Sequence, residues 1–524
     1  MAADRPPAAA RPGALSPGQI VDGFRVEEKL HVGGMAALWR VIRVDAGGRP
    51  LAGETMPLIM KVPRIKGGED PASIVGYEVE QMILPALSGP HVPKFVAKGD
   101  YAHQAYIVME RIAGETLRPR LDRAPLPLAE VVEIGQRVAT ALHDLHRQHL
   151  VHLDVKPSNI LFRPDGCAVL VDFGLSRHDH LPDLLEEEFT LPLGTGPYMS
   201  PEQVQFVRND PRSDLFALGV MLYHFTTGAR PFGQPTTVRG LRRRLYVDPV
   251  PPRALRPDCP PWLQEIILRC LEVKPEHRYQ SGAQLALALQ DPSQVALTAR
   301  AERRRQRGPL ALMRQAQRWF TALGAEPADD KAVSAGKQVL RSPIVMTAVD
   351  IEGAEPALLD ALRETVRRIV LTEPGARLAC VSVMRTARIG MDDLMDAAGQ
   401  SRHVKQIVNL KHWARPLAKS LSLEGERLTF HVLEAPDPAA AIVDFAQRAQ
   451  ADHIVMGARG NSTLRRYLGS VSSQVVAQAD CSVTVVRAPA AAGSSLAAPV
   501  PTGSASAAAP AATARFGGDA PKRR

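Results

Sequence analysis

The sequence of 524 residues has few cysteines and no long apolar run. Its five cysteines are isolated, odd in number and without metal-ligand spacing, which excludes a disulfide framework and favours a reducing compartment. A membrane-spanning helix needs about 18 or more consecutive apolar residues, and no such stretch occurs. The first fifteen residues also lack the apolar core of a signal peptide. We therefore expect a cytoplasmic protein without a membrane span.

Aromatic residues make up only 5% of the chain, although its formal net charge is +9. A basic chain can favour nucleic acid, but no basic patch is interleaved with aromatics, so we expect no nucleic-acid partner. The arginine-rich stretch after residue 300 keeps a nucleic-acid regulator as an alternative, which would require steeply salt-dependent binding. Hydrophobic residues at 45% and charged residues at 23% are typical of globular domains.

Composition divides the chain into two patterned blocks and three connecting or terminal segments. We expect disorder in the Pro/Ala-rich N-terminus and in the Ala/Pro-rich tail, and an amphipathic helix in the basic linker. That helix packs on its own domain or docks on a partner or membrane. The predicted segments are 1–17 (disordered), 18–291 (first domain), 292–340 (linker), 341–488 (second domain) and 489–524 (disordered).

The first block contains a loop in which Asp154, Lys156 and Asn159 have fixed offsets, followed after an apolar run by Asp172-Phe173-Gly174. Phosphoryl transfer needs these residue types together. A carboxylate orients the attacking hydroxyl and accepts its proton, an amide oxygen and a second carboxylate hold Mg²⁺, and a cation screens the γ-phosphate.

This order of motifs resembles the eukaryotic-like serine/threonine protein kinases. The resemblance implies an α+β bilobal protein-kinase fold, ATP and Mg²⁺ as cofactors, and protein substrates. It implies that Asp154 is the catalytic base, that Lys156 is the phosphate-side cation, and that Asn159 and Asp172 are metal ligands. A lysine two positions after the base is similar to the serine/threonine branch rather than the tyrosine branch.

Upstream, an apolar strand ends at Lys61, which the resemblance places on the α- and β-phosphates. Its partner is a helical glutamate, for which Glu80 is favoured over Glu78 by the family's spacing. The glycine-rich loop is degraded, since His31 and Ala36 replace two of its glycines. The resemblance assigns the other nucleotide contacts to His31, Val32, Gly33, Gly34, Leu38, Met109, Glu110, Ile112 and Leu161.

Downstream, the resemblance implies that Thr195 braces Asp154 and Lys156, that Asp214 anchors the catalytic loop, and that Arg278 pairs with Glu202 in a structural salt bridge. Leu153 stands where many kinases have an arginine that grips an activation-loop phosphate. Phosphorylation, at Thr190 above all, should therefore matter less. The acidic run 186–188 just before Thr190 is either a solvated loop or a built-in negative charge.

The second block alternates strands and helices, which predicts an α/β doubly wound parallel sheet. Asp437-Pro438 reads as the start of a helix. A strand ending in an acid and a later strand running into a glycine-rich loop resemble the ATP-binding branch of the universal stress protein family. That family implies a sensory module with a second adenine nucleotide, and it allows a homodimer through the last strand. The implied contacts are Asp350, Gly457, Gly460, Gly469 and Ser470.

Besides the nucleic-acid regulator, three readings of the whole chain remain open at this point. The first is an active kinase with a stress-sensing domain, favoured because every residue with a chemical role is present. The second is a pseudokinase scaffold that binds ATP and transfers nothing. The third is a small-molecule kinase, against which the segment 195–202 and the helix beginning near Asp214 argue, because they serve a polypeptide site. A family member that binds no nucleotide is the alternative for the second block.

Overall fold

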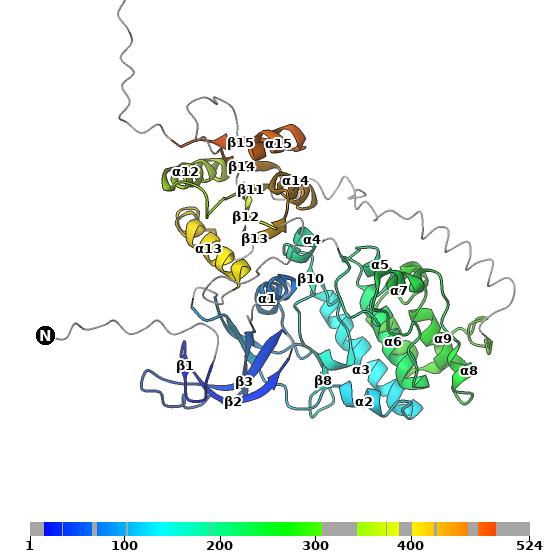
Figure 1. Cartoon of the computed structure of the whole chain (residues 1–524). Helices are drawn as coiled ribbons and strands as arrows, with labels where there is room; N and C mark the ends of the chain where they lie inside the picture. The colour runs from blue at the N-terminus through cyan, green and yellow to red at the C-terminus, as the bar shows by residue number, and fades with distance from the viewer. Residues whose placement is uncertain are drawn as a thin grey trace, which may run out of the picture.

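The computed structural model describes residues 15–33, 35–64, 71–100, 103–189, 191–305, 343–373, 375–386, 401–423, 427–458 and 470–488. Figure 1 shows a small sheet lobe in blue, a helical lobe in cyan and green, and an α/β domain in yellow and orange. The predicted linker helix lies outside the described residues, as do most of both predicted disordered ends. Within the part of the chain that is described, no helix combines the length and the apolar character needed to cross a bilayer.

The sheet lobe is built on six antiparallel strands in the order β1-β2-β3-β4-β6-β5. Apolar residues alternate along β4, so Leu58, Met60 and Val62 are buried in the lobe core while Lys61 faces the other side. Leu15, predicted to belong to a disordered end, is buried in the same core. The elements are β1 (Ile20–Val21), β2 (Phe24–Val32), β3 (Ala36–Arg43), β4 (Leu58–Pro63), α1 (Pro71–Ile83), η1 (Leu84–Ala86), β5 (Phe95–Gly99) and β6 (Tyr106–Glu110).

The helical lobe is centred on α6 (Arg212–Thr227), whose predicted apolar stretch is buried on all sides. The other helices are α2 (Arg118–Asp122), α3 (Leu128–Arg147), η2 (Pro157–Asn159), α4 (Leu184–Glu188), α5 (Pro201–Val204), α7 (Val238–Arg242), η3 (Arg243–Leu245), α8 (Pro252–Leu255), α9 (Pro261–Cys270), η4 (Pro275–His277), α10 (Gly282–Gln290) and η5 (Pro292–Gln294). Two short strand pairs join β7 (Leu150–Val151) to β10 (Arg177–His178) and β8 (Ile160–Phe162) to β9 (Ala168–Leu170).

The start of the predicted linker is not a linker. Thr298 donates to both carboxylate oxygens of Glu265 at 2.9 and 3.0 Å, and Arg300 pairs with the same side chain at 2.9 Å. Glu265 is buried in α9. Residues 292–305 therefore pack on the helical lobe, because a buried carboxylate there needs these partners.

The α/β domain confirms the predicted doubly wound parallel sheet, with strand order β13-β12-β11-β14-β15. Its α12 and α13 cover one face, and α14 and α15 cover the other. Asp437 caps α14 through the backbone N–H groups of Ala439 and Ala440, as its sequence predicts. The elements are β11 (Ile344–Ala348), α12 (Pro356–Thr372), β12 (Arg377–Arg385), α13 (Arg402–Leu421), β13 (Leu428–Ala435), α14 (Pro438–Arg448), β14 (His453–Gly457), α15 (Ser470–Gln478) and β15 (Ser482–Val486).

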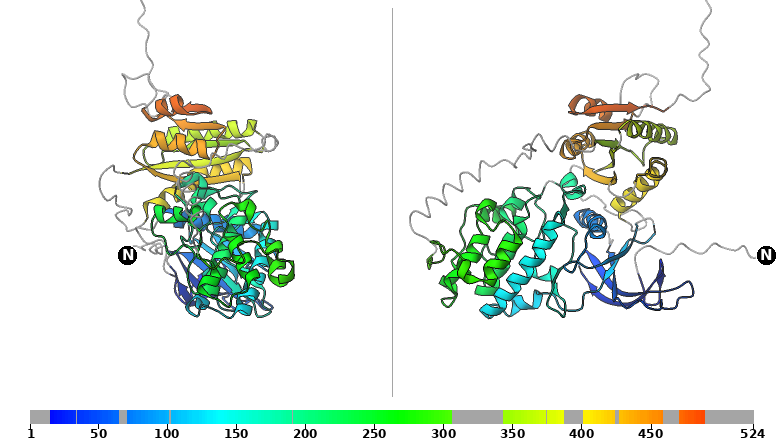
Figure 2. Two further views of the ribbon diagram at one scale, coloured as in Figure 1. Left: turned by 90° about the vertical axis from the view of Figure 1, so that its right-hand side faces the viewer. Right: turned by 180° about the vertical axis from the view of Figure 1, so that it is seen from behind.

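The α/β domain lies against α1 and α4 of the two-lobed part of the chain (Figures 1 and 2). Figures 1 and 2 show α13, β13 and α14 beside α1 and α4. Ile407 of α13 and Val432 of β13 are buried in the same apolar cluster as Val75 of α1 and Leu185 of α4. The fold therefore joins the second domain to the two elements that border the candidate site.

Candidate active site

The catalytic loop runs from β7 into η2 and brings three of the predicted residues into direct contact. Thr195 Oγ1 donates to Asp154 Oδ1 at 2.7 Å, and Lys156 Nζ lies 2.6 Å from Asp154 Oδ2 and 3.0 Å from Thr195 Oγ1. Asp154 is only 6% exposed. The carboxylate is thus fixed in position, with a cation beside it.

Asn159 lies behind the same carboxylate. Its Nδ2 donates to the backbone oxygen and to Oδ2 of Asp154, both at 3.1 Å. The backbone N–H of Val171 donates to the carbonyl of Asn159 at 3.0 Å, which brings the Asp172 segment beside the loop. Because the amide nitrogen is committed to Asp154, the amide oxygen is the end of Asn159 that suits a cation.

Lys61 forms one ion pair within the sheet lobe and one with the other lobe. Its Nζ lies 2.5 Å from Glu80 on α1 and 2.8 Å from Asp172. Burial lowers the pKa of Lys61, but the two carboxylates outweigh it and raise the pKa above its usual value. The charge of Lys61 in turn lowers the pKa of Asp172. Burial raises the pKa of Glu80, and the charge of Lys61 opposes this shift. The pairing of Lys61 with Asp172 favours the charged forms of both, which suit binding to phosphate and metal.

Glu78, the alternative partner of Lys61, points elsewhere. It pairs with Lys411 of α13 at 2.6 Å. Two positions along a helix differ by about 200°, so one of these glutamates can face the cleft and the other the second domain. The structure favours Glu80 as the partner of Lys61.

The catalytic loop is anchored from below by Asp214 of α6. Its carboxylate accepts the backbone N–H groups of His152 and Leu153 at 2.9 Å each and lies 2.9 Å from His146. Leu153 and Asp172 both have a positive φ, of 61° and 69°. Such conformations cost about 1–3 kcal/mol and persist only where neighbours hold them, which is common at active sites.

Beyond the loop, Arg278 pairs with Glu202 through two hydrogen bonds of 2.5 and 2.7 Å. Both side chains are buried, and Ser213 donates to the same carboxylate at 2.8 Å. This pair holds α5 against α6 at a distance from the reacting groups. Its place in the fold is structural, as the sequence predicts.

The residues predicted to contact the nucleotide lie on or just after β2, β3, β6 and β8. Leu38 is the cross-strand partner of Lys61, and Met109 is the cross-strand partner of Ile59. Leu161 forms an isolated β-bridge with Thr116. His31 and Val32 end β2, and Gly33 closes the turn by donating to Ala36 at 2.9 Å. Ile112 is buried just after β6. Gly34 lies outside the described residues.

Glu110 has a partner that the sequence did not reveal. Arg163 grips its carboxylate through two bonds of 2.5 and 2.9 Å, and this contact lowers the pKa of Glu110. The side chain is therefore used within the protein, which leaves only the backbone of Glu110 for a nucleotide. No local signal marks Arg163, because it lies 53 positions away.

In the second domain, the structure brings Asp350 and Gly457 together at the carboxyl ends of β11 and β14. These strands are adjacent, and the sheet order reverses between them, where ligands bind in open α/β sheets. Gly457 also has a packing role, because an added Cβ would lie 3.1 Å from Leu358. Ser470 begins α15, whereas Gly460 and Gly469 lie outside the described residues.

Comparison with known proteins gives two family matches. The protein kinase domain family matches residues 61–290, and the universal stress protein family matches residues 343–487. The protein kinase match begins at Lys61 and includes Glu80, Asp154, Asn159 and Asp172.

Several curated bacterial relatives share the first domain. The serine/threonine-protein kinase pkn3 of Myxococcus xanthus is 31% identical over 370 residues, covering 67% of this chain and 66% of its own. PknL of Mycobacterium tuberculosis is 31% identical over 268 residues, 51% of this chain and 65% of the relative. PknB of Mycolicibacterium smegmatis is 30% identical over 277 residues, which cover 52% of this chain and 43% of the relative. The chain thus spans two thirds or less of these relatives.

The geometry and the matches agree along the chain. The paired lysine, glutamate and aspartate lie within the first match, and the sheet with its switch point at β11 and β14 lies within the second. The chain therefore belongs to two families in succession, with a serine/threonine protein kinase domain followed by a universal stress protein domain.

Proposed function

We propose that the chain transfers the γ-phosphate of ATP to serine or threonine hydroxyls of protein substrates, itself included. One observation carries this proposal: Asp154, held by Thr195 and Lys156, lies beside the Asp172 segment whose carboxylate pairs with Lys61 and, through it, with Glu80. Phosphoryl transfer depends mainly on such positioning and charge stabilisation.

Each residue has a role in the proposed reaction. Asp154 orients the substrate hydroxyl and receives its proton as the hydroxyl oxygen bonds to the γ-phosphorus, while the bond from that phosphorus to the bridging oxygen breaks and ADP leaves. Lys156 screens the charge that is transferred. Lys61 holds the α- and β-phosphates, and Glu80 fixes Lys61.

Asn159 and Asp172 are suited to hold Mg²⁺. Asn159 offers an amide oxygen, and Asp172 offers a carboxylate with a lowered pKa. Mg²⁺ commonly takes one or two such ligands besides phosphates and water. When bound, the metal would neutralise the phosphate oxygens. The fit of these donors supports an active kinase over a pseudokinase.

The segment after Thr195 supports a polypeptide substrate. Arg244, which is buried, donates to the carbonyls of Gly196, at 2.7 Å, and Met199. Burial lowers the pKa of Arg244 to about 10, so the guanidinium stays charged at neutral pH. The Glu202–Arg278 pair also holds this segment, whose Thr195 contacts Asp154, so the segment can position an extended peptide near Asp154.

We also propose that the second domain binds an adenine nucleotide at the switch point near Asp350 and Gly457. Support comes from the place of both residues at the ends of adjacent strands, where the sheet order reverses. Its role is regulatory.

Labelled ATP with Mg²⁺ tests the main proposal. The purified full chain should label itself and a generic basic protein, and Asp154→Asn should not. Undetectable labelling by the wild-type chain at micromolar enzyme would overturn it.

A further inference from the structure

Helix α4 contains the acidic residues 186–188 of the activation segment, and Glu187 and Glu188 contact the second domain. Arg377 on β12 forms two bonds to Glu187, of 2.6 and 2.8 Å, and a third to Thr429 at 2.8 Å. The side chains of Arg377 and Glu187 are 10% and 8% exposed. Of the two alternatives for 186–188, the solvated loop is therefore wrong, because the second domain covers Glu187.

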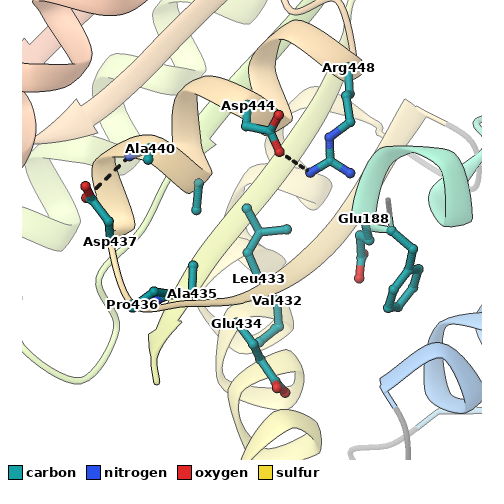
Figure 3. Close-up of a pocket in the computed structure, with 12 residues that line it drawn as sticks. Glu188, Val432, Leu433, Glu434, Ala435, Pro436, Asp437, Ala440, Asp444 and Arg448 are labelled. Carbon is teal, nitrogen blue, oxygen red and sulfur yellow. Dashed lines mark hydrogen bonds and ion pairs between the residues drawn. The ribbon is translucent and has the colours of Figure 1, made fainter. Parts of the chain in front are cut away.

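The next acidic residue is also bound by the second domain. His431 of β13 is buried, with Nδ1 2.8 Å from Glu188 Oε1 and Nε2 2.9 Å from Thr429 Oγ1. Burial raises the pKa of Glu188 and lowers that of His431, which favours a neutral hydrogen bond between them. A pocket of about 510 Å³ borders this contact, lined by Glu188, Glu434, Asp444 and Arg448 among others (Figure 3).

Helix α1 is held from both sides. Glu80 pairs with Lys61 toward the cleft, and Glu78 pairs with Lys411 toward the second domain. The helix also touches the backbone of the Asp172 segment, because a Cβ added to Gly76 would lie 2.9 Å from the carbonyl oxygen of Gly174. A shift of α1 away from the second domain would thus move Glu80 relative to Lys61.

The kinase domain holds α4 at its cap and through apolar packing against α1. Asp183 caps the helix and pairs with Arg208 at 2.7 Å. The catalytic loop offers no guanidinium to the rest of the segment, since Leu153 occupies that position and is buried. The cation that pairs with Glu187 in this segment comes from the second domain, as Arg377.

We propose that Arg377, His431 and Lys411 are positioning residues for phosphoryl transfer, through which the second domain keeps α1 and α4 in the arrangement that pairs Lys61 with Glu80. This inference rests on the proposed kinase activity. Kinases control activity through this helix and this loop, and ordering by phosphorylation uses an arginine–phosphate pair. Here Glu187 and Arg377 take the places of phosphate and arginine.

The test uses the full chain and peptide phosphorylation under saturating ATP. Arg377→Gln and Lys411→Glu should each lower kcat about tenfold, a typical coupling between sites, with a smaller change in the KM for peptide. The reversed pair Lys411→Glu with Glu78→Lys should restore most of the lost kcat, which a general packing defect would not allow. Arg368→Gln, an exposed residue of α12 paired only with Glu364, is the matched control.

Hydrogen exchange provides a second measurement that does not depend on turnover. In Arg377→Gln the amides of α4 and α1 should exchange faster, while those of β11 and β14 stay protected. Unchanged kcat and unchanged exchange in both interface variants would overturn the inference while the kinase proposal stands. An inactive wild-type chain that nevertheless shows the exchange changes would overturn the kinase proposal and, with it, the role in catalysis.

Discussion

Lys411 and Glu78 form an ion pair of 2.6 Å between the second domain and the helix that supplies Glu80 to the catalytic cleft. The pair connects the second domain to the domain in which the proposed catalytic residues lie. It also explains why two glutamates occur two positions apart on α1, since each serves a different neighbour.

Replacing Asp154 with asparagine should remove phosphoryl transfer and keep ATP binding. The amide cannot accept the hydroxyl proton, and general bases contribute about 10²- to 10⁴-fold. Single-turnover labelling measures the loss, and nucleotide titration checks binding. Asp258→Asn, at a residue whose side chain is 67% exposed, is the control. A loss below about tenfold would contradict the role of Asp154.

Replacing Gly76 with alanine should displace α1. The new methyl group would lie 2.9 Å from a backbone oxygen that cannot easily move. Overpacking of this kind costs about 1–3 kcal/mol, and a small misplacement of catalytic groups can cost roughly 10²-fold in rate. Denaturant unfolding and kcat measure the two effects. Ser73→Ala in the same helix should change neither, and a fully active Gly76→Ala would show that α1 tolerates movement.

Replacing Glu202 with glutamine should destabilise the helical lobe. It leaves the buried guanidinium of Arg278 without its charge partner, and breaking such a pair costs about 3–5 kcal/mol. The free energy of unfolding of the kinase lobe measures this cost. Asp122→Asn removes an exposed ion pair with Arg118 and should change it by less than about 1 kcal/mol. Equal effects of the two variants would refute the structural role of Glu202.

Replacing Asp350 should remove a second nucleotide site. Calorimetric titration of the full chain in the Asp154→Asn background should detect two ATP sites, and Asp350→Ala should weaken one of them about tenfold or more, as loss of a charged hydrogen bond implies. Asp360→Asn, whose side chain is 72% exposed, is the control. A single site in the parent chain would remove the proposal.

Replacing Thr190 with alanine should reduce turnover only modestly, because Arg377 and His431 already hold the acidic residues that precede it. Thr190 itself lies outside the described residues. Autophosphorylated and phosphatase-treated enzyme, compared by kcat, provide the measurement. A fall of about a hundredfold would mean that a phosphate, rather than Glu187, orders the segment.

The sequence predicts contacts between residues that lie close together along the chain. Asp154, Lys156 and Asn159 meet because they share one loop. The strand predicted to run into the glycine-rich loop is β14, because its apolar run is bounded by polar and glycine residues. Residues joined through tertiary contacts carry no such signal. Arg377 meets Glu187 across 190 positions and Lys411 meets Glu78 across 333. The acidic run 186–188 is apparent in the sequence, but the burial of Glu187 and Glu188 against the second domain is not.

The contacts between the domains combine buried apolar side chains, among them Ile407 and Val432, with charged and hydrogen-bonded groups withdrawn from water. Removing charges from solvent offsets much of what their attraction returns, so the charged part of this junction stabilises less than an apolar part of equal size. A ligand of the second domain that binds one arrangement of the two domains better than another shifts the equilibrium between them by that difference in affinity. The junction is therefore the place through which a ligand of the second domain would act on α1 and α4.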